Sequence, residues 1–213
     1  MSDGRLVRLP RGALAHLRRS DEGLAQLMAT VGRCRLRVGF AETHLASLVR
    51  AIVYQQLSGK AAATIFGRFR ALYPEDAFPT AQQIRRTHYT KLRKAGLSRQ
   101  KQMALRDLCR HVVEGRLPLH DVEELEDEAL IERLTAVRGI GRWSAQMFAI
   151  FQLGRLDHWP VDDLAVKKGA ALVQGLDAMP TRKEMEAWGE RFRPYRTVTA
   201  WYLWRSQDIQ TPG

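Results

Sequence analysis

The sequence is poor in cysteine and in long apolar runs, and each shortage argues against a class of protein. Only two cysteines, Cys34 and Cys109, occur in 213 residues. They are too few for a four-thiolate iron–sulfur cluster or zinc site, so we expect two reduced thiols in a cytoplasmic protein. No eighteen apolar residues follow one another, which argues against a membrane-spanning helix, and the first twelve residues lack the pattern of a secretory signal.

Carboxylates and lysines are also scarce beside arginine. The chain has 34 Lys and Arg residues against 23 Asp and Glu residues, a formal net charge of +11, and only seven of the cations are lysines. This surplus favours a polyanionic partner such as nucleic acid, although a GC-rich genome also raises the arginine content. The one acidic block, residues 121–128, is typical of a solvated loop and helix start, where carboxylates suit the helix dipole.

Strand-like alternation is missing, and helical spacing of apolar residues runs through the chain. Glycine and the short polar residues divide this pattern into separate helices. We expect helices over residues 45–53, 60–72, 129–135, 142–153 and 195–205, capping boxes at Thr80 with Gln83 and Thr181 with Glu184, and a helix cap at Ser98. The predicted fold class is therefore all-α.

Two glycines, Gly139 and Gly141, flank Ile140 in a short turn between two predicted helices. Glycine allows positive φ angles and lets the backbone approach a phosphate closely. The helix that begins at Arg142 then offers free N–H groups to that phosphate, and we expect Ile140 to be buried so that it holds the turn. An ordinary corner between helices contains the same glycines, so the turn alone does not decide between packing and DNA binding.

The full pattern around this turn, Leu-x-x-Val-x-Gly-Ile-Gly-Arg-Trp-Ser-Ala over residues 134–145, is far more specific. It resembles the hairpin of the helix-hairpin-helix DNA glycosylases, specifically the alkylation-damage branch, 3-methyladenine DNA glycosylase II. The resemblance extends from about residue 40 to the C-terminus. It implies two helical lobes with an active-site cleft between them, one over about 50–125 and the other over 1–49 plus 126–213, the latter carrying the hairpin. The DNA-binding residues that it implies are Val137, Gly139, Ile140, Gly141 and Arg142.

The same resemblance assigns chemistry to Trp143 and Asp163. Bifunctional members of the superfamily carry a nucleophilic lysine where this chain has Trp143, which cannot form a Schiff base, so a monofunctional enzyme is implied. The catalytic aspartate of the family lies about twenty residues further along, a spacing that Asp163 fits and that Asp162 misses by one. Two aspartates before Leu164 are also typical of a helix N-cap, and one carboxylate can cap while the other faces the cleft.

A base pocket and a wedge are implied as well, because a glycosylase must extrude its target base from the stack. Trp143, Met147 and Trp204 match pocket positions of the family, although such side chains are also common in protein cores. Residues 51–62 resemble the helix–turn–helix that carries the wedge, the side chain that fills the gap left by the base. The alignment favours Gln56 as the wedge, with Leu57 as the alternative, and a plain polar turn would look the same.

The function implied by the resemblance is excision of alkylated bases of the 3-methyladenine type from double-stranded DNA in base excision repair. We expect a monomer that is cytoplasmic and nucleoid-associated, with no membrane contact, metal, iron–sulfur cluster or other cofactor beyond a monovalent cation at the hairpin carbonyls. Residues 1–40 are too few and too helical for the β-rich N-terminal domain of longer bacterial relatives, so the compact form is expected. Two alternatives stay open: a non-catalytic DNA-binding protein with the same hairpin, and a glycosylase for other base lesions.

Overall fold

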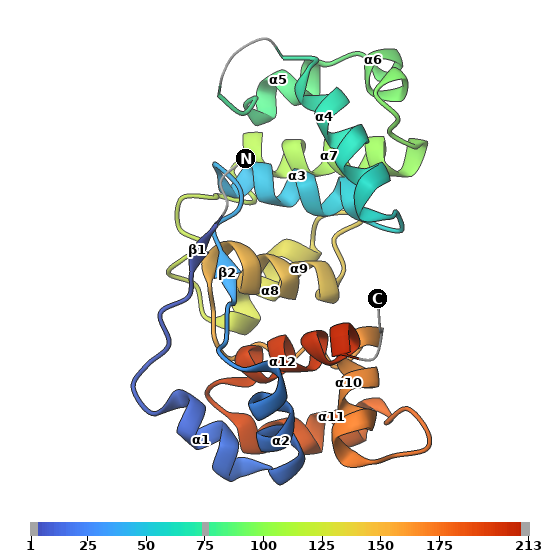
Figure 1. The fold of residues 1–213 in the computed structure, drawn as a ribbon. Helices are drawn as coiled ribbons and strands as arrows, with labels where there is room; N and C mark the ends of the chain where they lie inside the picture. Colours follow the sequence, from blue (N-terminus) through green and yellow to red (C-terminus); the bar gives the residue numbers. More distant parts are fainter. Residues whose placement is uncertain (1–3, 74–76, 210–213) are drawn as a thin grey trace. The chain divides into compact units, whose positions relative to one another are not determined.

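The computed structural model describes residues 4–73 and 77–209, which group into two compact units. Within the described ranges, unit 1 consists of residues from 39 to 148, and unit 2 combines residues 4–38 with residues 149–209 (Figure 1). The predicted division placed the hairpin in the same lobe as the C-terminal part of the chain. In the structure the hairpin belongs to unit 1, because it packs on a helix of that unit through contacts given below.

Unit 1 is helical throughout its regular structure, and helix α7 runs through its middle. This helix packs against α3, α5 and α6 and buries Leu105 and Leu108 among them. Two helix caps that the sequence predicts are present. The Thr80 side chain accepts a backbone N–H at the start of α5, and the Ser98 side chain does so at the start of α7. The helices are α3 (His44–Tyr54), α4 (Gly59–Arg70), α5 (Ala81–Arg86), α6 (Tyr89–Lys94), α7 (Arg99–Val113), α8 (Asp127–Thr135) and α9 (Arg142–Phe148).

Unit 2 joins the two ends of the chain around an aromatic core. The rings of Trp188 and Phe192 meet edge to face at 4.8 Å, and Trp159 donates its indole N–H to the Met185 carbonyl at 2.7 Å. A Cβ at Gly189 would lie 2.3 Å from that indole nitrogen, so only glycine fits there. The elements are β1 (Arg5–Leu6), α1 (Ala13–Ser20), α2 (Glu22–Val31), β2 (Arg37–Val38), the π-helix η1 (Ala149–Leu153), α10 (Leu164–Gln174), α11 (Arg182–Gly189), the 3₁₀ helix η2 (Glu190–Phe192) and α12 (Arg196–Ile209).

The all-α prediction is confirmed, since the β-structure of the described chain is limited to the antiparallel pair β1–β2. Both predicted capping boxes are present, at the starts of α5 and α11. The predicted helical run over 142–153 is present, but only its first part, α9, is an α-helix, and from Ala149 to Leu153 it continues as the π-helix η1. The wider turn holds one more residue than an α-turn and so rotates the side chains that follow it. Within the described ranges, no helix has the length and apolar character needed to cross a bilayer.

Candidate functional site

Of the two glycines in the turn between α8 and α9, Gly139 adopts the positive φ for which glycine was predicted, and Gly141 does not. Gly139 has a φ of 81°, in the left-handed region that glycine favours. A Cβ on Gly139 would lie 2.8 Å from the Cβ of Ala104, so α7 and the turn approach each other at this glycine. Val137 and Ile140 are buried, and the Ile140 N–H donates to the Val137 carbonyl at 3.1 Å. The expected burial of Ile140 is confirmed.

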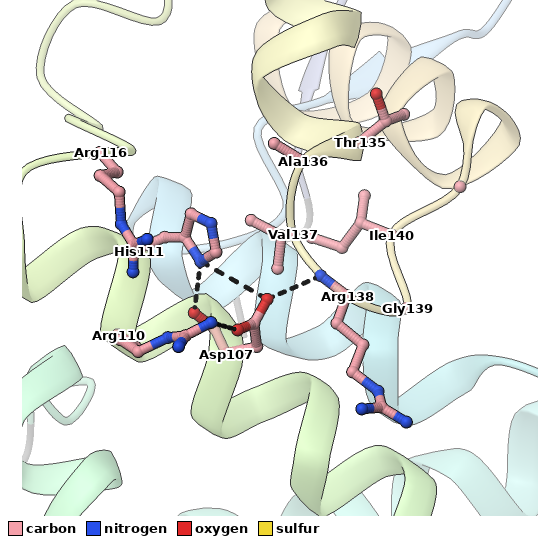
Figure 2. Close-up of a pocket in the computed structure, with 11 residues that line it drawn as sticks. Asp107, Arg110, His111, Arg116, Thr135, Ala136, Val137, Arg138, Gly139 and Ile140 are labelled. Carbon is pink, nitrogen blue, oxygen red and sulfur yellow. Dashed lines mark hydrogen bonds and ion pairs between the residues drawn. The ribbon is translucent and has the colours of Figure 1, made fainter.

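Helix α7 also holds the turn through the carboxylate of Asp107 (Figure 2). One oxygen accepts the backbone N–H of Arg138 at 2.8 Å, the other accepts from Arg110, and His111 Nδ1 lies 2.9 Å from the Asp107 carbonyl. Burial raises the pKa of Asp107, but the Arg138 N–H, Arg110 and His111 outweigh it and hold this pKa below its ordinary value of 3.8. The carboxylate is therefore charged near neutral pH, and it anchors the turn by a charge-assisted hydrogen bond.

The loop between α3 and α4 also fixes the turn, through hydrogen bonds from Gln55. Gln55 Nε2 donates to the Gly139 carbonyl at 2.8 Å and to Ser144 Oγ at 3.3 Å. The next residue, Gln56, has a φ of 56° and is the one described residue other than glycine in the left-handed region. Such backbone strain is concentrated at functional sites. Gln56 and Leu57 are both exposed, so both wedge candidates are accessible in a strained loop that is tied to the hairpin.

This loop and the start of α9 line one pocket of about 600 Å³. Ligand pockets usually measure about 300–1,000 Å³, so a purine base fits within this volume. The ring of Trp143 is 45% exposed, which is unusual for so large an apolar side chain. The pocket therefore unites two predicted base-pocket residues with both wedge candidates, and it adds Tyr54 as a second aromatic wall. Its lining residues are Ala51, Tyr54, Gln55, Gln56, Leu57, Trp143, Ser144 and Met147.

Trp204, the third predicted pocket residue, belongs to unit 2 and contacts Asp163 there. Its indole N–H donates to Asp163 Oδ1 at 3.1 Å, and its ring stacks on Phe151 of η1 with 5.5 Å between centroids. Asp163 is the N-cap of α10, and the same Oδ1 accepts the backbone N–H groups of Ala165 and Val166, each at 3.0 Å. Asp163 is only 9% exposed, so the carboxylate is buried and its plane is fixed by three donors.

Asp162 has a different environment. Its side chain is 56% exposed and pairs with Arg182 at 3.1 Å across to α11. The cap is Asp163 itself, so the two carboxylates do not divide the roles of cap and cleft residue as the sequence had suggested. The reason is positional, since an N-cap must directly precede the first helical residue, here Leu164. Burial and fixed orientation distinguish Asp163 from its neighbour.

The two arginines of the hairpin differ in their pairing. The guanidinium of Arg138 forms no ion pair with another described residue, whereas Arg142 makes a bidentate ion pair with Glu128 at 3.1 and 2.6 Å. A phosphate at the start of α9 would have to compete with Glu128 for Arg142. The described part of the chain contains no group of three or more His, Cys, Asp or Glu side chains suited to a metal ion.

Residues 49–194, which include Gln56, Trp143 and Asp163, match the HhH-GPD superfamily of base excision DNA repair proteins. The chain belongs to this superfamily. It is 36% identical over 196 residues to DNA-3-methyladenine glycosylase 1 of Schizosaccharomyces pombe, covering 91% of this chain and 86% of that protein. The alkylbase DNA glycosidase-like protein mag2 of the same yeast is 32% identical, with 93% and 94% covered. A solved structure of the Schizosaccharomyces pombe 3-methyladenine DNA glycosylase with abasic DNA has a TM-score of 0.84 and 35% identity, covering 93% and 97%.

Several residues of this HhH-GPD chain that support the predicted site were missed by sequence reasoning. Tyr54 and Gln55 directly precede the wedge candidates, so their place at a helix end could have indicated a role. Asp107 and Phe151 have no comparable signal in the sequence. The contact of Asp107 depends on how α7 packs against the hairpin, and the position of Phe151 depends on a π-turn that breaks the helical period.

Proposed function

We propose that this chain is a monofunctional DNA glycosylase that flips alkylated bases out of duplex DNA and hydrolyses their N-glycosidic bonds in base excision repair. The proposal depends above all on Asp163, a buried carboxylate held by three donors in a chain that also has an aromatic pocket beside a strained loop. The name of the 36% identical yeast relative, DNA-3-methyladenine glycosylase 1, supports the choice of alkylated bases.

Binding begins at the hairpin in this proposal. Backbone N–H groups at the start of α9 and the Arg138 side chain contact phosphates, which positions the protein on the duplex without reading sequence. Extrusion of the target costs a few kcal/mol, and it is offset by stacking of the base between Tyr54 and Trp143. A base made cationic by alkylation gains further from cation–π attraction to these rings. Gln56 fills the vacated space and hydrogen-bonds the orphaned partner base.

Asp163 supplies the chemistry. An alkylated purine carries positive charge, so when its bond to C1′ breaks the electron pair leaves with the base and neutralises it. Positive charge then develops on the sugar, and the Asp163 carboxylate stabilises it. The oxygen of a water molecule bonds to C1′ and passes its proton to the carboxylate. Trp143 has no amine to attack C1′, so no strand cleavage accompanies excision.

A monovalent cation at the hairpin carbonyls is proposed from the family resemblance alone. Backbone carbonyl oxygens suit a hard cation, and the carbonyl of Val137 lies in the turn. Its oxygen already accepts the Ile140 N–H, and that of Gly139 accepts from Gln55, so a cation would share these acceptors. Such an ion would bring positive charge to the phosphate that meets the turn.

The test is single-turnover excision from methylated duplex DNA by Asp163→Asn, with Asp162→Asn as the matched control. Asparagine keeps an oxygen that can cap α10 and accept from Trp204, so the fold should persist while the rate falls by about two to three powers of ten. The control should excise normally. Wild-type activity in Asp163→Asn contradicts the assignment. Mass spectrometry of the released bases separates alkylated from other lesions, and release of no base by the wild type supports a non-catalytic DNA-binding protein.

A further inference from the structure

Helices α5 and α6 carry five exposed cations that neither the pocket nor the hairpin explains. Arg85 and Arg86 occupy the last turn of α5, and Lys91, Arg93 and Lys94 occupy the last turn of α6. We refer to these five residues as the basic surface. All of them belong to unit 1.

The basic surface has no acidic counterpart. No Asp or Glu occurs between residues 77 and 106 of the sequence, and within the described chain none of the five cations forms an ion pair. Elsewhere in unit 1, Arg110, Arg133 and Arg142 each pair with a carboxylate. A cation at a helix C-terminus gains about 0.3–1 kcal/mol from the helix dipole, which accounts for one charge on each helix. The helix dipole does not account for five positive charges that repel one another.

The frame beneath the basic surface is rigid. Ile84 and Leu92, on the inner faces of the two short helices, are 1% and 0% exposed. The connection between the helices is held at Thr87, whose carbonyl accepts from Arg106 of α7 at 3.1 Å and whose hydroxyl lies 2.7 Å from the Tyr73 hydroxyl. The cations are therefore displayed on a fixed scaffold, which reduces the ordering cost of binding a partner.

An aromatic pair accompanies the cations. Tyr89 is 55% exposed, and its ring lies 4.4 Å from that of His88 at the start of α6. Exposed aromatic rings beside cations suit a nucleic acid, because the cations contact phosphates while the rings pack on sugars or unstacked bases. An acidic protein surface would offer no repeating line of phosphates and no sugar faces.

We propose that the basic surface is a second contact with duplex DNA, binding backbone phosphates beside those held by the hairpin. The identity of the partner rests on the proposed function. Helix α7 links the two contacts, since it packs against α5 and α6 and also anchors the hairpin through Asp107. Its 15 residues span about 22 Å at 1.5 Å per residue, which is less than one helical turn of DNA at about 34 Å. This separation is within the reach of one duplex.

The test is the salt dependence of duplex binding, measured by fluorescence anisotropy on undamaged and abasic duplexes. The triple variant Lys91→Gln, Arg93→Gln, Lys94→Gln should lower the slope of log Kobs against log salt by about 2–3, because each lost phosphate contact removes about 0.9. Its Kd near 0.1 M salt should rise more than about tenfold. The charge-preserving variant Lys91→Arg, Lys94→Arg should keep the wild-type slope.

The matched control removes the same net charge from α11 and η2 by Arg182→Gln, Lys183→Gln and Arg191→Gln, two of which already pair with carboxylates. Its slope should change by less than about 1. Equal slopes for wild type and the basic-surface variant, or equal losses in that variant and the control, would overturn the proposal. Undamaged duplex needs no excision, so failure of the proposed function would appear separately, as a wild-type protein that releases no base.

Discussion

Replacement of Asp107 tests whether the hairpin must be anchored to α7 before it can bind DNA. Asp107→Ala removes the acceptor of the Arg138 N–H and leaves Arg110 without its partner carboxylate. A hydrogen bond to a charged group contributes about 1.5–3 kcal/mol, and part of this loss should weaken DNA binding because the hairpin then has to be ordered at binding. We expect the Kd for an abasic duplex to rise about tenfold, equivalent to about 1.4 kcal/mol.

The sign of this effect separates anchoring from simple electrostatics. Removal of a negative charge beside a DNA-binding turn should tighten binding if Coulomb attraction alone matters. Glu114→Gln supplies that comparison, because Glu114 pairs with Arg116 at the end of α7 and is not bonded to the hairpin. We expect equal or tighter binding in Glu114→Gln and weaker binding in Asp107→Ala. Tighter binding in both variants would refute the reasoning.

The pH dependence of stability gives a second readout of the same contact. The pKa of Asp107 is lowered on folding, so the unfolded chain binds the proton more tightly and stability rises with pH through the window below about 4. The stabilisation is complete above the unfolded value of 3.8 and is lost as pH falls through the folded value. In urea unfolding, the difference between wild type and Asp107→Ala should be largest near pH 7 and should shrink below about pH 4. A constant difference across this range contradicts the charged anchor.

Three further substitutions test the hairpin, the wedge and the pocket. Gly139→Ala should destabilise the protein by about 1–3 kcal/mol in urea unfolding, because its Cβ would meet Ala104 at 2.8 Å in a left-handed backbone; unchanged stability contradicts the close approach. Gln56→Gly should keep or raise the free energy of unfolding, because glycine relieves the positive φ. The same variant should weaken base extrusion, measured by 2-aminopurine fluorescence. A larger loss of extrusion in Leu57→Ala than in Gln56→Gly would make Leu57 the wedge. Trp143→Ala should slow single-turnover excision about 5–150-fold through lost stacking of about 1–3 kcal/mol, with little change in melting temperature because the ring is half-exposed.

The features that could be predicted from the sequence are those set by local chemistry. The backbone of Gly139, the burial of Ile140 and the capping boxes each depend on a few neighbouring residues, and all three are confirmed. The change from α-helix to π-helix after Phe148 could not be predicted, because the apolar pattern of residues 142–153 continues across it. The unit to which the hairpin belongs was likewise not evident from the sequence, since it depends on the contacts of Asp107 and Ala104 across the fold.

The same distinction explains why Asp163 was ambiguous in the sequence and is distinctive in the structure. An aspartate before a helix is common, and capping alone would account for its two backbone N–H bonds. The third donor, the indole of Trp204, is 41 residues away in the chain and brings the carboxylate against an aromatic pair with Phe151. A cap residue is a favourable place for an acid that must act without reorganising, because helix N–H groups already fix its orientation. Capping and catalysis therefore use the same rigidity, and Asp163→Asn separates them by preserving the first and removing the charge that the second requires.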